Sequence, residues 1–152
     1  MNAKKLQLGN RLKYSTAKVW RKEIRGTEFD LTINDLIHIE SNPKDGIFEP
    51  IELNEALLLY RCGFQKEASR YGKMEIKCLY QLKILQNSAT LYLRTAGSLG
   101  YFWGFLIEGK SAELDACASS IKYLHELQNL LSAFGHELII EKESEQTLFT
   151  QK

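Results

Sequence analysis

The spacing of hydrophobic residues in the first part of the chain is typical of strands. In residues 10–24, apolar and polar side chains alternate, with Leu12 and Tyr14 in a first run and Val19 in a second. Residues 15–16, a serine and a threonine, separate the two runs and are types common in turns. A period of two indicates strands with one buried face. We therefore expect a short hairpin in this segment.

Two short helices are predicted next, because capping residues precede apolar positions with helical spacing. Thr32 is placed as the N-cap of the first helix, Asp35 occupies its capping-box position, and Pro43 stops it. Asn54 is placed as the N-cap of the second helix, and Gly63 follows as a residue suited to the left-handed conformation. Both helices lie near the N-terminal third of the chain.

From Phe64 to Ile107 the pattern changes to apolar-rich runs separated by turn-forming residues. The runs read MEIKCLYQLKIL, ATLYLRT and GYFWGFLI, with QNS and AGSLG between them. In the second run, Leu91 and Leu93 alternate with Tyr92 and Arg94. Aromatic and branched residues with this alternation favour strands, so this part of the chain predicts an antiparallel meander.

The stretch IKYLHELQNLLSAFGHELII, residues 121–140, has the clearest helical period. At about 100° per residue, six apolar side chains fall in one arc of roughly 120°. These are Tyr123, Leu124, Leu127, Leu130, Leu131 and Phe134. Ser119 or Ser120 is expected as the N-cap and Gly135 as the stop, and HELIIEK after it predicts a last strand. Residues 142–152 are polar and are expected to fray.

These elements together predict an α+β fold in a single domain, residues 1–152, with an ordered core at about residues 9–141. The antiparallel meander sheet is expected to pack against one long C-terminal amphipathic helix, with the two short helices beside them. A chain of 152 residues with 44% hydrophobic and 26% charged residues is ordinary for one globular domain. It therefore needs neither disulfides nor a metal to form its core.

Charge, cysteines and hydropathy indicate the cellular setting. The net charge of +1 gives no general attraction to nucleic acid or to an anionic membrane. Cys62, Cys78 and Cys117 lack the spacing of a zinc or redox motif, and MNAKKLQLGN has no apolar core of a signal peptide. GYFWGFLI, the longest apolar run, is about half of the roughly 20 residues that span a membrane. We expect a cytoplasmic protein with reduced thiols and no membrane partner.

One flank of the last predicted helix carries a cluster of polar side chains. His125, Asn129 and Ser132 are neighbours on the helical wheel, and Gln128 lies at the border of the apolar arc. An imidazole, two carboxamides and a hydroxyl on one flank are a candidate binding site. The alternative is that these groups bond to the backbone of a neighbouring loop or strand edge, as polar residues beside a core usually do.

Metal, cofactor and catalytic chemistry are not indicated. His38, His125 and His136 lie in three different elements, without the spacing of metal ligands on one helical face. No nucleophile motif surrounds the cysteines. The glycine-rich TAGSLGYFWG lacks the Lys-Ser or Lys-Thr of a phosphate-binding loop and leads into a strand, which favours a hairpin turn. We therefore predict no metal, no cofactor and no assigned catalytic residue.

The N-terminal segment is basic and contains aromatic residues, so it is a candidate nucleic-acid surface. Cationic and aromatic side chains can contact phosphates and stack on bases. The alternative is an edge strand whose lysines prevent aggregation. The candidate residues are Arg11, Lys13, Lys18, Trp20, Arg21 and Lys22.

Two stretches, residues 48–64 and 121–140, carry a resemblance to a family. With LTINDLIHIE before them, they resemble, in the same order, an uncharacterised family of small proteins carried by phages and mobile elements of Bacteroidales-type gut bacteria. The resemblance spans roughly residues 9–140, although the family often has Trp in the second helix and its central insert differs, which leaves the strand count between Phe64 and Ile107 open. The matching positions are Phe48, Pro50, Ile51, Leu53, Gly63, Phe64, His125, Leu127, Gln128, Asn129, Leu130, Gly135, Glu137 and Leu138.

The resemblance implies an accessory protein of a mobile element and brings no established activity. Since no catalytic constellation is visible, we expect a non-enzymatic protein that binds a partner protein. The first alternative is a nucleic-acid-binding module that uses the basic segment. The second is a small enzyme with His125 as acid or base, oriented by Gln128 or Asn129. A homodimer is compatible with this surface.

Overall fold

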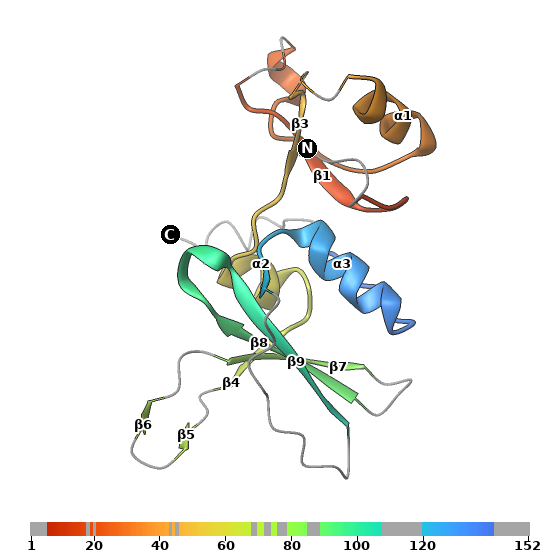
Figure 1. The fold of residues 1–152 in the computed structure, drawn as a ribbon. Helices are drawn as coiled ribbons and strands as arrows, with labels where there is room; N and C mark the ends of the chain where they lie inside the picture. The colour runs from red at the N-terminus through yellow and green to blue at the C-terminus, as the bar shows by residue number, and fades with distance from the viewer. Residues whose placement is uncertain are drawn as a thin grey trace. The chain divides into compact units, whose positions relative to one another are not determined.

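The computed structural model describes residues 6–17, 19, 21–42, 44, 46–67, 70–71, 74–75, 79–84, 89–107 and 120–141 (Figure 1). The fold is α+β, with antiparallel sheets and short helices. The chain divides into two compact units. Unit 1 comprises residues 1–52 with 123–134, and unit 2 comprises residues 53–122 with 135–152. The single-domain expectation stays a prediction, and the tail at 142–152 lies outside the described residues.

Unit 1 contains a three-stranded antiparallel sheet in the order β2-β1-β3. Its strands are β1 (Arg11–Tyr14), β2 (Glu28–Asp30) and β3 (Phe48–Pro50). Leu12 faces Phe29 on β2 and Pro50 on β3, so β1 is the central strand. Both partners of β1 come from segments well beyond residues 10–24.

The predicted hairpin at residues 10–24 is therefore wrong. Its first strand exists as β1, but residues 22–24 form a short 3-10 helix, η2 (Lys22–Ile24). Tyr14 closes the loop by accepting from the N–H of Gly26 and donating to the carbonyl of Thr27, both at 2.9 Å. Val19 is buried without being in a strand. Val19 is an apolar residue that fixes a loop to the core. Over so few residues, the alternation of apolar and polar positions does not distinguish such a loop residue from a strand residue.

The helix α1 (Ile33–Ser41) packs on the apolar face of this sheet. It begins as predicted, because Thr32 Oγ1 accepts the N–H of Asp35 at 3.3 Å and the Asp35 carboxylate accepts the N–H of Thr32 at 3.0 Å. His38 meets the ring of Phe48 edge-on, with centroids 5.7 Å apart. The buried cluster beneath the helix comprises Leu6, Leu12, Leu31 and Ile39, with Phe29, Leu36 and Phe48 packed against it.

The last helix, α3 (Leu124–Ala133), belongs to unit 1 and is shorter than expected at 10 residues. The expectation that Ser119 or Ser120 caps it is wrong, because Ser120 lies in the strand β10 (Ser120–Ile121) and pairs with Phe102. Tyr123 is the N-cap, and its N–H bonds to the carboxylate of Glu126 at 3.0 Å. The pairing of Ser120 with a neighbouring strand thus decides its conformation, although its residue type favours a helix cap.

The predicted end of α3 is confirmed, but the strand predicted after it is not. Gly135 follows the helix with φ of 78°, as predicted for a stop in the left-handed region. The predicted last strand is wrong, because residues 136–140 are described and form no strand. Leu138 is buried, and the segment is held by Glu141, whose N–H bonds to the carbonyl of Arg61 at 2.8 Å. An apolar run can be anchored in this way without a neighbouring strand.

Unit 2 contains a five-stranded antiparallel sheet in the order β10-β9-β8-β7-β4. The predicted meander is confirmed as β7 (Leu79–Ile84), β8 (Ala89–Thr95) and β9 (Tyr101–Ile107), which lie as neighbours in Figure 1. The 3-10 turn η4 (Gly97–Leu99) joins β8 to β9. β4 (Gln65–Glu67) and β10 extend the meander at its two edges, and β5 (Arg70–Tyr71) pairs separately with β6 (Met74–Glu75).

The two faces of this sheet differ, as the alternation along β8 predicted. Leu91 and Leu93 are fully buried, whereas Tyr92 and Arg94 are half-buried on the other face. The helix α2 (Glu55–Tyr60) belongs to the Leu91 side, because Tyr80 pairs with Leu93 and its hydroxyl donates to Glu55 of α2. As predicted, Asn54 caps this helix, accepting the N–H of Leu57 at 2.8 Å.

The carboxylate of Glu55 is expected to make the stability of unit 2 depend on pH in the acid range. Its carboxylate accepts from Lys66 Nζ at 2.7 Å and from Tyr80 Oη at 3.1 Å. The hydrogen bond from Lys66 is the largest cause that lowers the pKa of Glu55 below 4.5, burial opposes it, and the bond from Tyr80 assists. A lowered folded-state pKa contributes stability that is present above the unfolded pKa and is lost as the pH falls through the folded pKa.

We therefore expect Glu55→Gln to lower the free energy of unfolding at pH 7 by less than about 1 kcal/mol, since the ion pair is half exposed. The difference from wild type should vanish in acid, where Glu55 itself is protonated. Urea titrations at several pH values measure this, with Glu40→Gln on exposed α1 as a control that should change little. A difference that is the same at all pH values would contradict the assignment.

Candidate functional site

Two consecutive side chains of α3 hold the segment that leads into β1. Gln128 Oε1 accepts the backbone N–H of Arg11 at 2.7 Å, and Gln128 Nε2 donates to the carbonyl of Gly9 at 3.2 Å. Asn129 Oδ1 accepts from Nδ2 of Asn10 at 2.8 Å. Three hydrogen bonds therefore join two neighbouring residues of the helix to three neighbouring residues of the strand segment.

The register of β1 explains why the N–H of Arg11 is available to a side chain. Odd-numbered residues of β1 direct this group toward β3, as the N–H of Ser15 does to the residue before β3 at 2.7 Å. The partner of Arg11 in this ladder would be Ile51, but the carbonyl of Ile51 accepts the N–H of Leu124 at 2.8 Å. Gln128 therefore takes the place of a strand neighbour where β1 meets the start of α3.

The other two predicted site residues, His125 and Ser132, are placed differently. The His125 ring is 6% exposed and lies parallel to the ring of Tyr123, with centroids 5.9 Å apart and an interplanar angle of 7°. Ser132 is exposed. Of the four predicted site residues, Gln128 and Asn129 are therefore the two that the structure places on the segment leading into β1.

This arrangement has the geometry of a scaffold contact. Gln128 uses its acceptor and one donor on backbone groups, so both ends of its carboxamide are engaged within unit 1. A general acid or base must reach a substrate in an open pocket, and a buried, stacked His125 ring is not placed to do so. A ligand-binding role for these residues stays a prediction without direct support.

The arginines of the basic N-terminal segment are paired with carboxylates. Arg11 Nε lies 2.9 Å from Oδ1 of Asp30, and Arg21 Nε lies 3.2 Å from Oε1 of Glu23. Lys22 is exposed at the start of η2. Each arginine contact neutralises a charge that would otherwise attract phosphate.

The remaining basic candidates are divided between the sheet and the undescribed positions. Lys13 stands opposite Glu28 on β2 and Glu49 on β3, so carboxylates flank it on both sides in the sheet. Lys18 and Trp20 lie outside the described residues. The face of β1 that carries Arg11 and Lys13 therefore alternates in sign, which weakens its field for a phosphate backbone. Nucleic-acid binding by this segment stays a prediction.

Comparison with known proteins gives no parallel for this arrangement. No family model matches the chain, and no significant match exists among curated proteins or solved structures. The resemblance to proteins of phages and mobile elements therefore stays a prediction. Within the described ranges, no three His, Cys, Asp or Glu side chains gather as metal ligands. No helix in those ranges combines the length and apolar character needed to cross a membrane.

Two surfaces were not identified from the sequence. The first, which we call the apolar patch, consists of Leu8, Ile33 and Ile37, exposed at 58%, 60% and 57%. The second, which we call the Tyr92 face, is the side of the unit 2 sheet opposite α2. Its described side chains are Gln65, Gln81, Lys83, Thr90, Tyr92, Arg94, Phe102 and Ser120, and the register of β4 places Glu67 on the same face. Helical and strand periods contain both signals, but a period does not show how far each side chain is exposed in the folded chain.

Proposed function

We propose that the protein works without catalysis, in the cytoplasm, by binding a partner protein through the apolar patch. The observation that carries the proposal is the exposure of Ile33 and Ile37 on a helix whose other face is already packed on a core. Large apolar side chains grouped on a surface mark interaction sites more often than single exposed ones do. The mobile-element accessory role, proposed from the family resemblance, is compatible with such a binding protein.

The members of the apolar patch come from the first turns of α1 and from a turn that is hydrogen-bonded just before this helix. Ile33 and Ile37 are four residues apart on α1 and therefore share one flank of the helix. Leu8 precedes Gly9, whose N–H bonds to the carbonyl of Leu31 at 3.0 Å, two residues before Ile33. The capping box at Thr32 fixes the first turn of α1. The patch is thus presented by a capped helix and a bonded turn, which lowers the entropy lost on binding.

Charges on and near α1 define the partner further. The ionisable side chains of α1 other than His38 are Asp35 and Glu40, and Glu40 is exposed. Asp30, just before the helix, is also exposed, but it is paired with Arg11 and adds no net charge to this border. An acidic border around apolar anchors fits a partner with an apolar groove and a basic rim, the arrangement in which a helix face inserts its anchors.

The proposal is tested with the full chain as bait in host lysate, followed by titration of the purified captured protein. Ile33→Glu and Ile37→Glu should each weaken binding by at least about 10-fold, since each removes apolar burial and introduces a charge. Ile33 occupies the first turn of α1, where glutamate is compatible with the helix dipole. Circular dichroism checks that each variant remains folded.

Ile139→Glu is the matched control, because Ile139 is 78% exposed and lies outside the apolar patch. It should leave the affinity unchanged. Equal binding by wild type and both patch variants would overturn the proposal. Sedimentation of the protein alone separates one further outcome: self-association that Ile37→Glu abolishes would identify a second copy of the chain as the occupant and would also overturn it.

A further inference from the structure

Leu8 of the apolar patch lies in a tight turn formed by residues 7–10, which we call the Leu8 turn. The N–H of Asn10 closes this turn by donating to the carbonyl of Gln7 at 3.1 Å. Gly9, at the third position, has φ of 83°, a value that favours glycine there. Leu8 occupies the second position, and its side chain is exposed. The backbone that carries this exposed side chain therefore decides where it stands.

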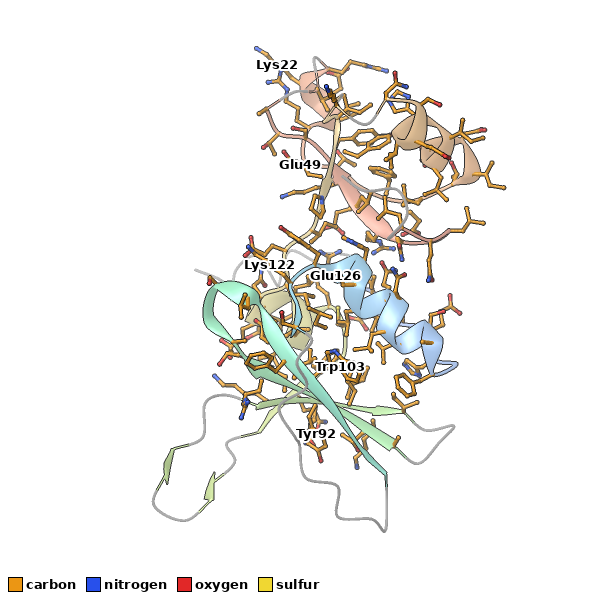
Figure 2. All side chains as sticks on the ribbon, in the orientation of Figure 1. Lys22, Glu49, Tyr92, Trp103, Lys122 and Glu126 are labelled. Atoms are coloured by element: carbon orange, nitrogen blue, oxygen red, sulfur yellow. The ribbon has the colours of Figure 1, made fainter. Side chains whose placement is uncertain are left out.

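A side chain of α3 holds the Leu8 turn from one side. Asn10 is only 3% exposed, and its carboxamide has two partners. Its Oδ1 accepts the N–H of Gln7 at 2.7 Å, and its Nδ2 donates to Oδ1 of Asn129 at 2.8 Å. Glu126, labelled in Figure 2, lies in the first turn of α3, and Asn129 follows three residues later on the same helix. A buried amide is costly to leave without a hydrogen bond, so the turn depends on Asn129 for its attachment to α3.

Backbone hydrogen bonds hold the Leu8 turn from the other side. The N–H of Gly9 donates to the carbonyl of Leu31 at 3.0 Å, and the N–H of Leu31 donates to the carbonyl of Asn10 at 2.8 Å. Leu31 lies two residues before Ile33, the first residue of α1. The turn that carries Leu8 and the helix start that carries Ile33 are therefore joined through Leu31.

The two attachments of the turn respond differently to substitution. The bonds to Leu31 are made by main-chain groups, so they remain when a side chain of α3 is changed. The bond from Asn10 is lost with the acceptor of Asn129. A turn that is held on one side only leaves Leu8 more freedom. Since ordering a residue on binding costs conformational entropy, a loose Leu8 binds a partner less tightly than a fixed one.

We propose that Asn129, acting through Asn10, is a positioning residue of the apolar patch and fixes Leu8 in the place relative to Ile33 that the partner protein recognises. The inference rests on the proposed function and adds that the partner binds Leu8 together with α1. Asn10 is too buried to contact the partner itself. Its effect on binding, and that of Asn129 through it, is therefore exerted through the position of Leu8.

The first test uses the full chain alone and measures amide hydrogen exchange by NMR. Asn129→Leu removes the acceptor of Asn10 and keeps a side chain of similar size. The amides of Gln7 and Asn10 should then exchange about 10-fold faster, as expected for the loss of one hydrogen bond. The reference is the amide of Leu36, which bonds to a carbonyl at the start of α1 at 3.1 Å and should be unaffected. Exchange that changes equally at all three amides would overturn the proposal.

Leu131→Val is the matched control for the exchange experiment. It removes volume from a fully buried residue of α3 and leaves the acceptor of Asn129 in place. Any change in exchange should therefore be the same in the Leu8 turn and in α1. Asn129→Asp, which keeps an acceptor oxygen, should bring the exchange rates in the turn back toward those of wild type.

The second test is a double-mutant cycle on affinity for the purified protein that the wild-type chain captures. Leu8→Ala should weaken binding about 10-fold, because it removes most of one apolar side chain from the interface. Asn129→Leu should weaken it about 3- to 10-fold, the cost of ordering one side chain. If Asn129 acts through Leu8, the double variant should bind no more weakly than Leu8→Ala alone. Asn129→Asp should restore most of the affinity that Asn129→Leu loses.

The possible results separate the positioning role from the proposed function. Losses that multiply in the double variant would overturn the positioning role and leave the apolar patch as a binding surface. The same holds if Ile33→Glu weakens binding and Asn129→Leu does not. Equal binding by wild type, Leu8→Ala and Ile33→Glu would overturn both. A chain that captures no protein would overturn the proposed function, and the exchange rates then decide whether Asn129 fixes the turn.

Discussion

Replacing Gly100 with alanine is expected to lower the free energy of unfolding by about 3 kcal/mol or more, the largest effect among the variants proposed. A Cβ at position 100 would lie 2.2 Å from the carbonyl oxygen of Ile121 and 2.7 Å from the Cα of Lys122. Both contacts are with backbone, which does not move aside as a flexible side chain does. Gly100 also has φ of 94°, a conformation that alanine rarely adopts.

The clash would fall on the site where β10 joins the sheet, since Ile121 pairs with Tyr101. Urea unfolding followed by circular dichroism measures the loss. Gly97→Ala in the same turn is the control, because Gly97 has φ of 60° but a Cβ added there would meet no atom within 4 Å. That variant should lose only about 1 to 2 kcal/mol. Equal losses in both variants would show that the close approach to β10 has no energetic consequence.

Replacing Gln128 with alanine is expected to lower the free energy of unfolding by about 2 kcal/mol. The substitution leaves the N–H of Arg11 without its hydrogen bond in a partly buried place, and such a group costs about 1 to 3 kcal/mol when left unsatisfied. The bond from Gln128 to the carbonyl of Gly9 is exposed, so water can replace it at little cost. The same loss should weaken the connection between α3 and β1. Thermal or urea unfolding measures the change.

Two further variants separate a scaffold role from a binding role for Gln128. Gln128→Glu keeps an acceptor for Arg11 but places a carboxylate against the carbonyl of Gly9, so it should also destabilise the protein. Ser132→Ala, on the same predicted flank but exposed, should change stability by less than about 0.5 kcal/mol. Unchanged stability in Gln128→Ala would contradict the scaffold role and would favour a ligand-binding role again.

The elements that the sequence predicted well are those whose signals are local. Thr32 with Asp35 and Asn54 mark helix starts because the capping bond joins residues three apart. The alternation of Leu91 and Leu93 with their neighbours shows which face of β8 is buried, because the side chains of a strand alternate by geometry. Neither signal depends on distant segments.

The errors in the predicted fold arose where distant pairing decided the structure. Ser120 is a good capping residue by type, but it pairs with Phe102 and lies in a strand. The local pattern predicts a partner for β1 in the next apolar run, whereas β1 pairs with β2 and β3. Pairing energy comes from hydrogen bonds and packing with segments that the local pattern does not contain.

In the candidate site, too, local spacing indicated some features and contacts with distant segments decided others. Amphipathic spacing placed Gln128 and Asn129 beside the apolar arc, and their contacts lie with residues 9–11, nearly 120 positions away in the chain. His125, on the same predicted flank, stacks on Tyr123 and is buried. Residue type and position on the helical wheel thus indicated which side chains are candidate site residues. The hydrogen-bond or packing partner of each side chain depends on which segment lies beside it in the fold.

By itself, the sequence determined the α+β class, the caps of α1 and α2, the meander from β7 to β9 and the stop at Gly135. It did so because backbone geometry and side-chain period act over a few residues. Only the tertiary structure decided the partners of β1, the start of α3, the role of Gln128, and which apolar and aromatic side chains remain on the surface. Those features depend on contacts between segments far apart in the chain, and a local pattern does not contain them.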